Sequence, residues 1–333
     1  MSAPAGQFRI LVTHPIDAGV RERIEAAGII DMNTSAEPWS RAEIAARLRN
    51  ADAMMAFMTD RVDAALLAGA ERLRVVGCAL KGYDSFDVEA CTRAGVWLTI
   101  VPDLLTEPTA ELALGLAISL ARNVRQGDAI VRSGRFQGWR PRLYGTGLQG
   151  STVAVIGLGQ VGRAIIARLA GFGCARLIGV DPAIRLDGVD SLPLEQALSQ
   201  ANFVFVAAPL TPQSYHLLDT AALAHCHPGL FIINIGRGSV VDEDAVAAAL
   251  QAGRLAGYAA DVFACEDWLL ATRPEHIPAS LLDRPDTLFT PHLGSAVREV
   301  RIAIEHRAAD NIIAVLEGRA PPDAVNRPKA VIA

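Results

Sequence analysis

Short apolar runs recur along the chain, and segments with helical spacing lie between them. The first series of runs covers 8–13, 53–57, 73–79 and 96–101. The second series covers 152–157, 176–181, 203–208, 230–235, 258–263 and 287–292. Because nearly continuous apolar runs that alternate with helices are typical of parallel strands in βαβ units, the sequence predicts an α/β protein. Its two series predict two doubly wound parallel-sheet domains.

The intervening segments show helical patterns. Helices are predicted over 17–28 and 40–51, between the first two runs. One long helix is predicted over 109–133 and a loop, rich in Gly, Arg and aromatic residues, over 134–150. A last helix over 296–317 is predicted to end at Gly318, because glycine readily adopts the left-handed conformation of a helix C-terminus.

The composition of the chain argues against several classes of function. The 333 residues are enough for two domains, and a net charge of −5 with mixed signs argues against nucleic acid and membrane surfaces as partners. No secretory signal is visible, and the longest apolar run, 112–121, is too short to span a bilayer. The five cysteines form no CxxC motif and no Cys/His cluster with metal-ligand spacing. We therefore expect a cytoplasmic protein with free thiols and no metal.

A glycine-rich turn follows the run 152–157. Its glycines, Gly157, Gly159 and Gly162, have GxGxxG spacing, and Leu158, Gln160 and Val161 fill the positions between them. In a strand–turn–helix unit these glycines allow a tight turn, a close approach to a pyrophosphate and helix–strand packing. The alternative is a structural glycine turn without a ligand. The context favours a dinucleotide site.

The residue that ends the next run predicts which dinucleotide binds. Asp181 can accept a hydrogen bond from a ribose 2′-hydroxyl and would repel a 2′-phosphate, so NAD is predicted over NADP. Pro182 follows it in the same turn. Arg185 is near enough in sequence to weaken this discrimination.

Three polar residues follow apolar runs of the second series, where ligands bind in open α/β sheets. Taken singly, each has a structural explanation: Arg237 as an ion-pair partner of acids in the next helix, Glu266 as a solvated acid, and His292 as a core histidine. Together they form a chemical set, since a guanidinium can hold an oxyanion, an imidazole can move a proton, and a carboxylate can orient that imidazole. The set predicts oxidation of an anionic substrate with hydride transfer to nicotinamide.

With these segments the chain resembles the D-2-hydroxyacid dehydrogenase family over nearly its whole length, in "VIGLGQVG", "NIGRGSVVDEDAV", "GYAADVF" and "TPHLGSA". The resemblance implies that Arg237, Glu266 and His292 form the active site. It also implies a homodimer and an interdomain cleft between a Rossmann-type NAD domain, 106–295, and a flavodoxin-like substrate domain, 1–105 with 296–333. Further cofactor contacts that it implies are Thr109, Pro209 and Asp261.

Other segments, among them "AMMAFMTDRVDA" and "LRVVGCALKGYDSFD", resemble the phosphite dehydrogenases, a branch of this family. This finer resemblance implies that Lys81 contacts the substrate, which would be the small inorganic anion phosphite. The pocket residues it implies are Met58, Gly82, Leu105, Trp139, Tyr144, Ser295 and Arg301.

Lys81 has an independent rationale. It follows the buried run 73–79, and phosphite is largely a dianion at neutral pH, so Arg237 with a second cation suits phosphite better than a monoanionic carboxylate. The alternative is an ordinary solvated lysine at a strand end. Two rival functions stay open: oxidation of a small D-2-hydroxy acid, and an NAD-sensing binding protein on the same fold.

Overall fold

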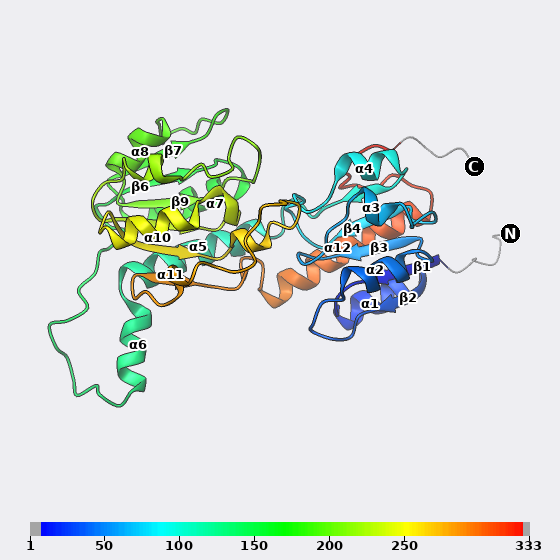
Figure 1. Cartoon of the computed structure of the whole chain (residues 1–333), viewed down its shortest axis with the longest axis horizontal. Coiled ribbons are helices and arrows are strands. Elements are labelled where there is room, and N and C mark those ends of the chain that lie inside the picture. Colours follow the sequence, from blue (N-terminus) through cyan, green and yellow to red (C-terminus); the bar gives the residue numbers. More distant parts are fainter. Residues whose placement is uncertain (1–7, 329–333) are drawn as a thin grey trace. The chain divides into compact units, whose positions relative to one another are not determined.

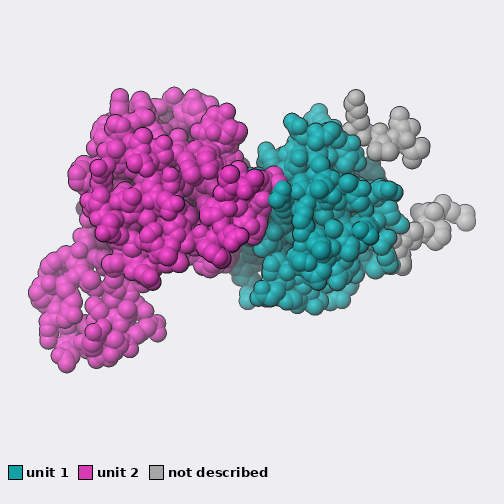
Figure 2. All heavy atoms as spheres, viewed as in Figure 1, with its two compact units in different colours: residues 1–105, 297–333 teal, residues 106–296 magenta. Residues whose placement is uncertain are grey.

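The computed structural model describes residues 8–328, which form two compact units (Figure 2). Unit 1 combines the chain up to Leu105 with the chain from Val297 onward. Unit 2 is the continuous segment Thr106–Ala296. Each unit contains its own parallel sheet with helices on both faces (Figure 1).

Unit 1 is built on a five-stranded sheet with the order β2-β1-β3-β4-β5, and every pairing is parallel. This is the flavodoxin-like order of doubly wound sheets. The strands are β1 (Phe8–Val12), β2 (Gly28–Met32), β3 (Ala53–Ala56), β4 (Val75–Cys78) and β5 (Trp97–Thr99). The helices are α1 (Ala18–Glu25), α2 (Arg41–Leu48), α3 (Ala64–Leu67), α4 (Val88–Arg93) and α12 (Arg298–Leu316).

Alternate side chains of these strands enter different cores. Ile10 and Val12 pack with α1 and α12 on one face, whereas Leu11 packs with α2 and the neighbouring helices on the other. Both faces are covered, so the central strands β3 and β4 carry continuous apolar sequence rather than an alternating pattern. Helix starts are fixed locally: Ser40 and Glu43 form a capping box at α2, and Asp63 caps α3.

Unit 2 has a seven-stranded parallel sheet with the order β12-β11-β10-β9-β6-β7-β8, a Rossmann arrangement with one added strand. Its strands are β6 (Thr152–Ile156), β7 (Arg176–Val180), β8 (Asp190–Ser191), β9 (Phe203–Val206), β10 (Leu230–Asn234), β11 (Leu255–Ala260) and β12 (Thr287–Phe289). Its α-helices are α5 (Thr106–Ala121), α6 (Val124–Arg132), α7 (Gln160–Leu169), α8 (Leu194–Gln200), α9 (Thr220–Leu223), α10 (Glu243–Gln251) and α11 (Ala279–Leu282). Three 3₁₀ turns are η1 (Ala170–Phe172), η2 (Gly238–Val240) and η3 (Ala264–Glu266).

The two faces of this sheet bury separate cores. Phe203 and Phe205 pack with α5 and α7, and Val204 and Val206 pack with α8, α9 and α10. Burying an aliphatic or aromatic side chain of this size contributes about 1.5–3 kcal/mol. These cores hold the strand ends, and the loops that follow them, in fixed positions.

The structure confirms the predicted fold class of two doubly wound parallel sheets, and it corrects two expectations. The predicted single helix over 109–133 is two helices, α5 and α6, because Asn123 adopts a left-handed conformation (φ 54°) between them. The edge strand β2 was not predicted, since its side chains are half-buried or exposed and provide no buried apolar run. Gly318 does follow α12 with φ 80°.

Within residues 8–328, no helix is both long and apolar enough to cross a membrane. All five cysteines lie in this part of the chain, and each is a free thiol.

Candidate functional site

The predicted functional residues of unit 2 lie in loops at one edge of its sheet. Gly157 follows β6, Pro209 follows β9, Arg237 follows β10, Glu266 follows β11 and His292 follows β12. Since the strands are parallel, these loops share the carboxyl edge, in the order in which the strands pair. The sheet therefore places the glycine turn and the polar triplet along the same edge.

The glycine turn has the geometry that a pyrophosphate site needs. Gly157 has φ 88°, and a Cβ there would lie 2.8 Å from the Ala208 backbone. A Cβ at Gly162 would lie 2.0 Å from the Gly157 oxygen. A Cβ at Gly159, by contrast, would have none of the surrounding atoms within 4 Å. Gly159 precedes α7 without a side-chain cap, and the amino end of a helix favours a negatively charged group. Leu158 differs from its neighbours because its side chain is buried in the core, and Gln160 and Val161 begin α7.

Asp181 is held by backbone donors. One oxygen accepts from Leu158 N at 2.8 Å, and the other accepts from Ala183 N and Ile184 N, both at 2.9 Å. Burial raises the pKa of Asp181, but these amides outweigh burial and hold the pKa below its ordinary value. The carboxylate thus stays charged beside the glycine turn, where it can accept a hydrogen bond from a ribose hydroxyl. Arg185 donates to the Asp181 and Ile184 carbonyls instead of the carboxylate.

The loop after β10 holds Arg237 through its backbone. The Asn234 amide donates to the Arg237 carbonyl at 3.0 Å, and the Arg237 guanidinium donates to Gly236 O at 2.8 Å. A Cβ at Gly238 would lie 1.8 Å from the Phe263 carbonyl carbon, so the η2 and η3 backbones are in direct contact. This contact keeps the Arg237 loop beside the turn that carries Glu266.

Glu266 and His292 form the central pair. Glu266 Oε2 lies 2.7 Å from His292 Nδ1, and Glu266 Oε1 accepts from Phe263 N at 2.8 Å. Both side chains are about one-third exposed. With Nδ1 donating to the carboxylate, Nε2 of the imidazole is the atom that can take or give a substrate proton.

A strained turn presents His292. Its φ is 55°, an uncommon value for a residue other than glycine. The Asp261 carboxylate fixes this turn by accepting from Thr290 Oγ1 at 2.5 Å, Leu293 N at 2.7 Å and Gly294 N at 2.8 Å. Strain of this kind persists where surrounding bonds over-determine a functional conformation.

Four other predicted residues of unit 2 lie on α5, in this turn, or in the loops after β7 and β9. Thr109 is buried on α5, and a Cβ at Gly294 would lie 3.1 Å from its hydroxyl. Ser295 is half-buried directly after Gly294, and Pro209 is exposed after β9 and accepts from Ser214 Oγ. Pro182 is exposed beside Asp181.

In unit 1, Lys81 lies at the carboxyl edge of the sheet. Pairing continues past β4, with Ala79 N donating to Ala56 O and Val101 N to Leu80 O, so the chain leaves the sheet at Lys81. Lys81 and Gly82 are half-buried. Met58 follows β3 at the same edge, and Leu105 packs against the core on the α12 face.

Arg301 approaches this edge from α12. Its guanidinium donates to Ala79 O at 3.1 Å and lies 5.9 Å from the centre of the Phe57 ring. Burial lowers the pKa of Arg301, although Glu305 partly offsets that effect. It is a partly buried cation next to the strand end that leads to Lys81.

Sequence reasoning missed two residues at this edge. His14 follows β1, and its Nε2 lies 2.6 Å from Thr59 Oγ1; burial and then Arg301 lower its pKa. Asp60 is buried, accepts from Thr13 Oγ1 and Phe57 N, and has its pKa raised by burial to about 6. The rule that located His292, a polar residue after an apolar run, could also have identified His14. The burial of Asp60 has no local sequence signal.

Trp139 and Tyr144 are not brought to the Glu266–His292 pair. They lie in a segment, 133–147, that extends with α6 away from the sheet of unit 2 (Figure 1). Their exposed fractions, 76% and 77%, are high for aromatic side chains. We call α6 with 133–147 the arm.

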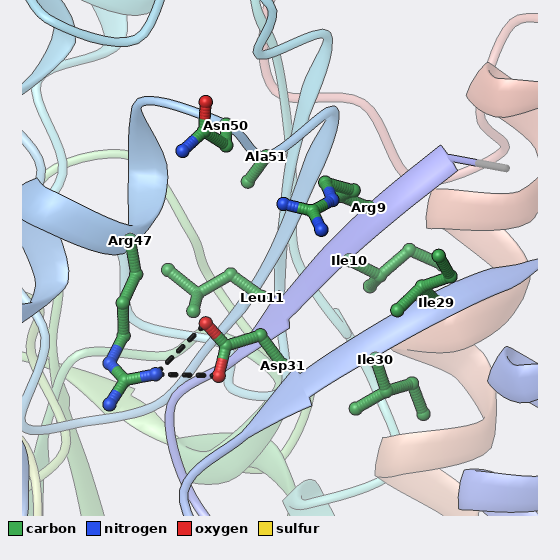
Figure 3. Close-up of a pocket in the computed structure, with 9 residues that line it drawn as sticks. All are labelled: Arg9, Ile10, Leu11, Ile29, Ile30, Asp31, Arg47, Asn50 and Ala51. Carbon is green, nitrogen blue, oxygen red and sulfur yellow. Dashed lines mark hydrogen bonds and ion pairs between the residues drawn. The ribbon is translucent and has the colours of Figure 1, made fainter.

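A cavity of about 240 Å³ lies elsewhere in unit 1, between α2 and the first two strands (Figure 3). The Arg47–Asp31 ion pair crosses it, at 2.7 Å, and apolar residues of β1 and β2 line much of the rest. Asn50 and Ala51, which precede β3, place it at the amino edge of the sheet, whereas Lys81 lies at the carboxyl edge. No predicted site residue lines it.

Comparisons with known proteins fit this geometry. Residues 114–294 match the family model described as "D-isomer specific 2-hydroxyacid dehydrogenase, NAD binding domain". Glyoxylate reductase from Korarchaeum cryptofilum is 34% identical over 96% of both chains. D-3-phosphoglycerate dehydrogenase from Rattus norvegicus is 32% identical over 96% of this chain and 58% of its own.

Two solved structures resemble the whole chain. The TT0316 protein from Thermus thermophilus is 33% identical, with a TM-score of 0.87 over 96% of this chain and all of its own. An NADPH-dependent glyoxylate/hydroxypyruvate reductase from Sinorhizobium meliloti, in complex with NADP and malonate, is 29% identical, with a TM-score of 0.85 over 98% of this chain and all of its own.

Proposed function

Because the chain belongs to the D-isomer-specific 2-hydroxyacid dehydrogenase family, we propose that Arg237, Glu266 and His292 act together in NAD-dependent hydride transfer on a small anion. The observation that carries the proposal is the 2.7 Å contact between Glu266 and His292 at the sheet edge that also bears the glycine turn. This arrangement supplies a proton carrier beside a dinucleotide site.

The residues of unit 2 fit NAD. The open space at Gly159, the uncapped start of α7 and the charged Asp181 would hold its pyrophosphate and ribose. Bound NAD supplies the hydride acceptor, and NADH the donor. His292 then takes up or releases the substrate proton at Nε2, Glu266 orients the imidazole, and Arg237 binds the anionic group of the substrate.

The substrate that the comparisons favour is a small 2-hydroxy acid or its 2-oxo acid. Several relatives at 31–35% identity are named glyoxylate reductases. Such a substrate has one carboxylate, which Arg237 can bind in two parallel hydrogen bonds, and one hydroxyl or carbonyl oxygen within reach of His292. The expected reaction is the reversible exchange of a hydride and a proton between the two acids.

Phosphite is the second candidate. Its oxidation consumes phosphite, NAD⁺ and water and gives phosphate, NADH and a proton, with water attacking phosphorus as the P–H hydride leaves. The resemblance of the Lys81 segment supports it, as does the residue choice: of 31 Lys and Arg residues in the sequence, only Lys81 and Lys329 are lysines. A lysine in a chain that otherwise uses arginine supports the view that position 81 needs a compact ammonium group rather than a planar guanidinium group. The proposal requires Lys81 and Arg237 to hold the same anion.

One assay separates the two candidates. NADH absorbance at 340 nm is followed with glyoxylate plus NADH, and with D-lactate, D-glycerate or phosphite plus NAD⁺. Turnover of a 2-oxo or 2-hydroxy acid without phosphite oxidation would exclude the second candidate, and the reverse would exclude the first. If phosphite is the substrate, Lys81→Ala loses about 10²-fold in kcat/KM, and the charge-matched Lys81→Arg recovers less than about tenfold. No turnover on either class, with NAD bound, would overturn the proposed function.

We further propose a homodimer formed through the arm. No residue of α6 is buried, and the arm exposes apolar side chains that a second copy can cover. Those exposed by half or more are Val124, Val131, Phe136, Trp139 and Tyr144.

A further inference from the structure

A buried carboxyl group lies behind the Glu266 turn and has no part in the chemistry described above. Glu243, the first residue of α10, is only 5% exposed. Its Oε1 accepts from Ala264 N at 2.9 Å, and Ala264 begins the η3 turn that ends at Glu266. Glu243 is thus one hydrogen bond and two residues away from the carboxylate that orients His292.

The other oxygen of Glu243 points to a protonated acid. Among the residues that the structure describes, Glu243 Oε2 is buried without a hydrogen-bond partner. A buried carboxylate oxygen without a donor is costly, whereas a carboxylic acid carries its own donor there. The Tyr258 hydroxyl of β11, which is fully buried, interacts electrostatically with Glu243.

The charges around Glu243 favour the same state. The titratable groups that face it are Asp244 on its own helix, Glu266, Asp267 and Cys265 on the η3 turn, and Tyr258 on β11. Burial, and then the negative charges of Asp267, Asp244 and Glu266, raise the pKa of Glu243 to about 7, although the Ala264 amide opposes this. The side chain therefore changes charge in the pH range in which a dehydrogenase works.

The η3 turn has little freedom to absorb such a change. Asp267 Oδ2 accepts from Ser239 N at 2.8 Å, and Gly238 is in contact with the Phe263 backbone. The turn is held by Glu243 on one side and by the Arg237 loop on the other. A new charge at Glu243 would repel Glu266 and Asp267 at once.

We propose that Glu243 is a positioning residue: as a buried carboxylic acid it holds the η3 turn so that Glu266 meets His292, and its ionisation weakens that arrangement. The kinetic part of this inference rests on the proposed dehydrogenase function. The structural part, that Glu243 positions the Glu266–His292 pair, does not depend on the proposed function.

The test compares Glu243→Gln with the wild type and with Asp244→Asn. Glutamine keeps an oxygen for Ala264 N and places an N–H donor where the acid carries its proton. Asp244→Asn removes an exposed charge from the adjacent position and serves as the matched control. The full-length protein is labelled with ¹³C at the glutamate carboxyl carbons and ¹⁵N in the histidine rings, and spectra are recorded from pH 5 to 9. The Glu243→Gln and His292→Gln spectra assign the two signals.

We expect one glutamate signal, absent from Glu243→Gln, to titrate near pH 7 in the wild type and at a somewhat lower pH in Asp244→Asn, where one neighbouring negative charge is gone. The His292 ring signals should follow that titration in the wild type and in Asp244→Asn, but show no such step in Glu243→Gln. A Glu243 signal that titrates below about pH 5.5, or His292 signals that behave alike in all three proteins, would overturn the proposal. These spectra need no substrate, so they decide the matter even if the proposed function fails.

The kinetic readout is the ratio of kcat in the wild type to kcat in Glu243→Gln. We expect this ratio to fall by about threefold or more between pH 6 and 8.5, because only the wild type gains the charge. The effects of His292 ionisation on the two enzymes largely cancel in the ratio. A ratio that is constant with pH would assign Glu243 a purely structural role.

Discussion

Among single side chains, Asp60 makes the sharpest prediction for stability. Folding raises its pKa from an ordinary value of 3.8 to about 6, so the folded state holds a proton that the unfolded state has released. The favourable contribution is complete below pH 3.8 and is lost as pH rises through about 6. A shift of about two units corresponds to about 3 kcal/mol.

Asp60→Asn removes this titration while an amide oxygen can still accept from Thr13 and Phe57. We therefore expect the unfolding free energy of the variant, relative to the wild type, to rise by about 3 kcal/mol between pH 4 and 7. Urea titrations at each pH measure it. A difference that does not change with pH would show that Asp60 titrates normally.

The catalytic set could be predicted as residue types at strand ends, but not as contacts. Arg237, Glu266 and His292 each follow an apolar run, and parallel strands bring such positions to one edge. The left-handed backbone of His292 and the burial of Glu243 depend on packing between distant segments. Because no local pattern encodes burial of an acid, Asp60 and Glu243 were beyond sequence reasoning.

Among the secondary-structure elements, the β6–α7 turn separates two kinds of glycine. Gly159→Ala is expected to leave the melting temperature unchanged and to weaken NAD binding by about tenfold or more, because the added Cβ enters the space for the pyrophosphate. Gly162→Ala is expected to lower stability by about 1–3 kcal/mol, because its Cβ would meet the Gly157 carbonyl. Thermal melts and NAD titrations of both variants test this. Equal NAD affinity in Gly159→Ala and wild type would contradict it.

The turn after β12 is expected to depend on Asp261. Asp261→Asn puts an N–H group toward the amide of Leu293 or Gly294, which leaves a buried donor unsatisfied at a cost of about 1–3 kcal/mol. We expect kcat to fall about tenfold or more while the affinity for NAD changes little. Thr290→Val, which removes a single hydrogen bond, is the milder control. A main effect on NAD affinity would instead support the predicted cofactor contact of Asp261.

Apolar runs in the sequence predicted most of the strands. The errors at β2 and at Asn123 arose where the sequence pattern carries no such signal. The buried strands β6, β9 and β10 coincide with apolar runs. Edge strand β2 alternates between partly buried and exposed positions and could not be distinguished from its surroundings. The break at Asn123 arises from one residue's left-handed conformation inside a segment with continuous helical spacing.

For the whole chain, the exposed arm predicts a dimer. We expect light scattering to give twice the 35.3 kDa chain mass, and the double variant Val131→Asp/Phe136→Asp to be largely monomeric, because charges would replace the apolar contact. Ile29→Asp, at an exposed apolar position outside the arm, should stay dimeric. A monomeric wild type, or a double variant that remains a dimer, would exclude the arm as the interface.

The measurement that tests the central claim most directly is the turnover of His292→Gln, followed with binding of NADH to the same variant. With the substrate that the wild type turns over, the account predicts a loss of about 10²–10⁴-fold in kcat, since the proton carrier is removed. NADH affinity should stay within about threefold, since the glycine turn follows a different strand. Turnover within about tenfold of the wild type, with NADH bound normally, would show that the Glu266–His292 pair does not carry the chemistry.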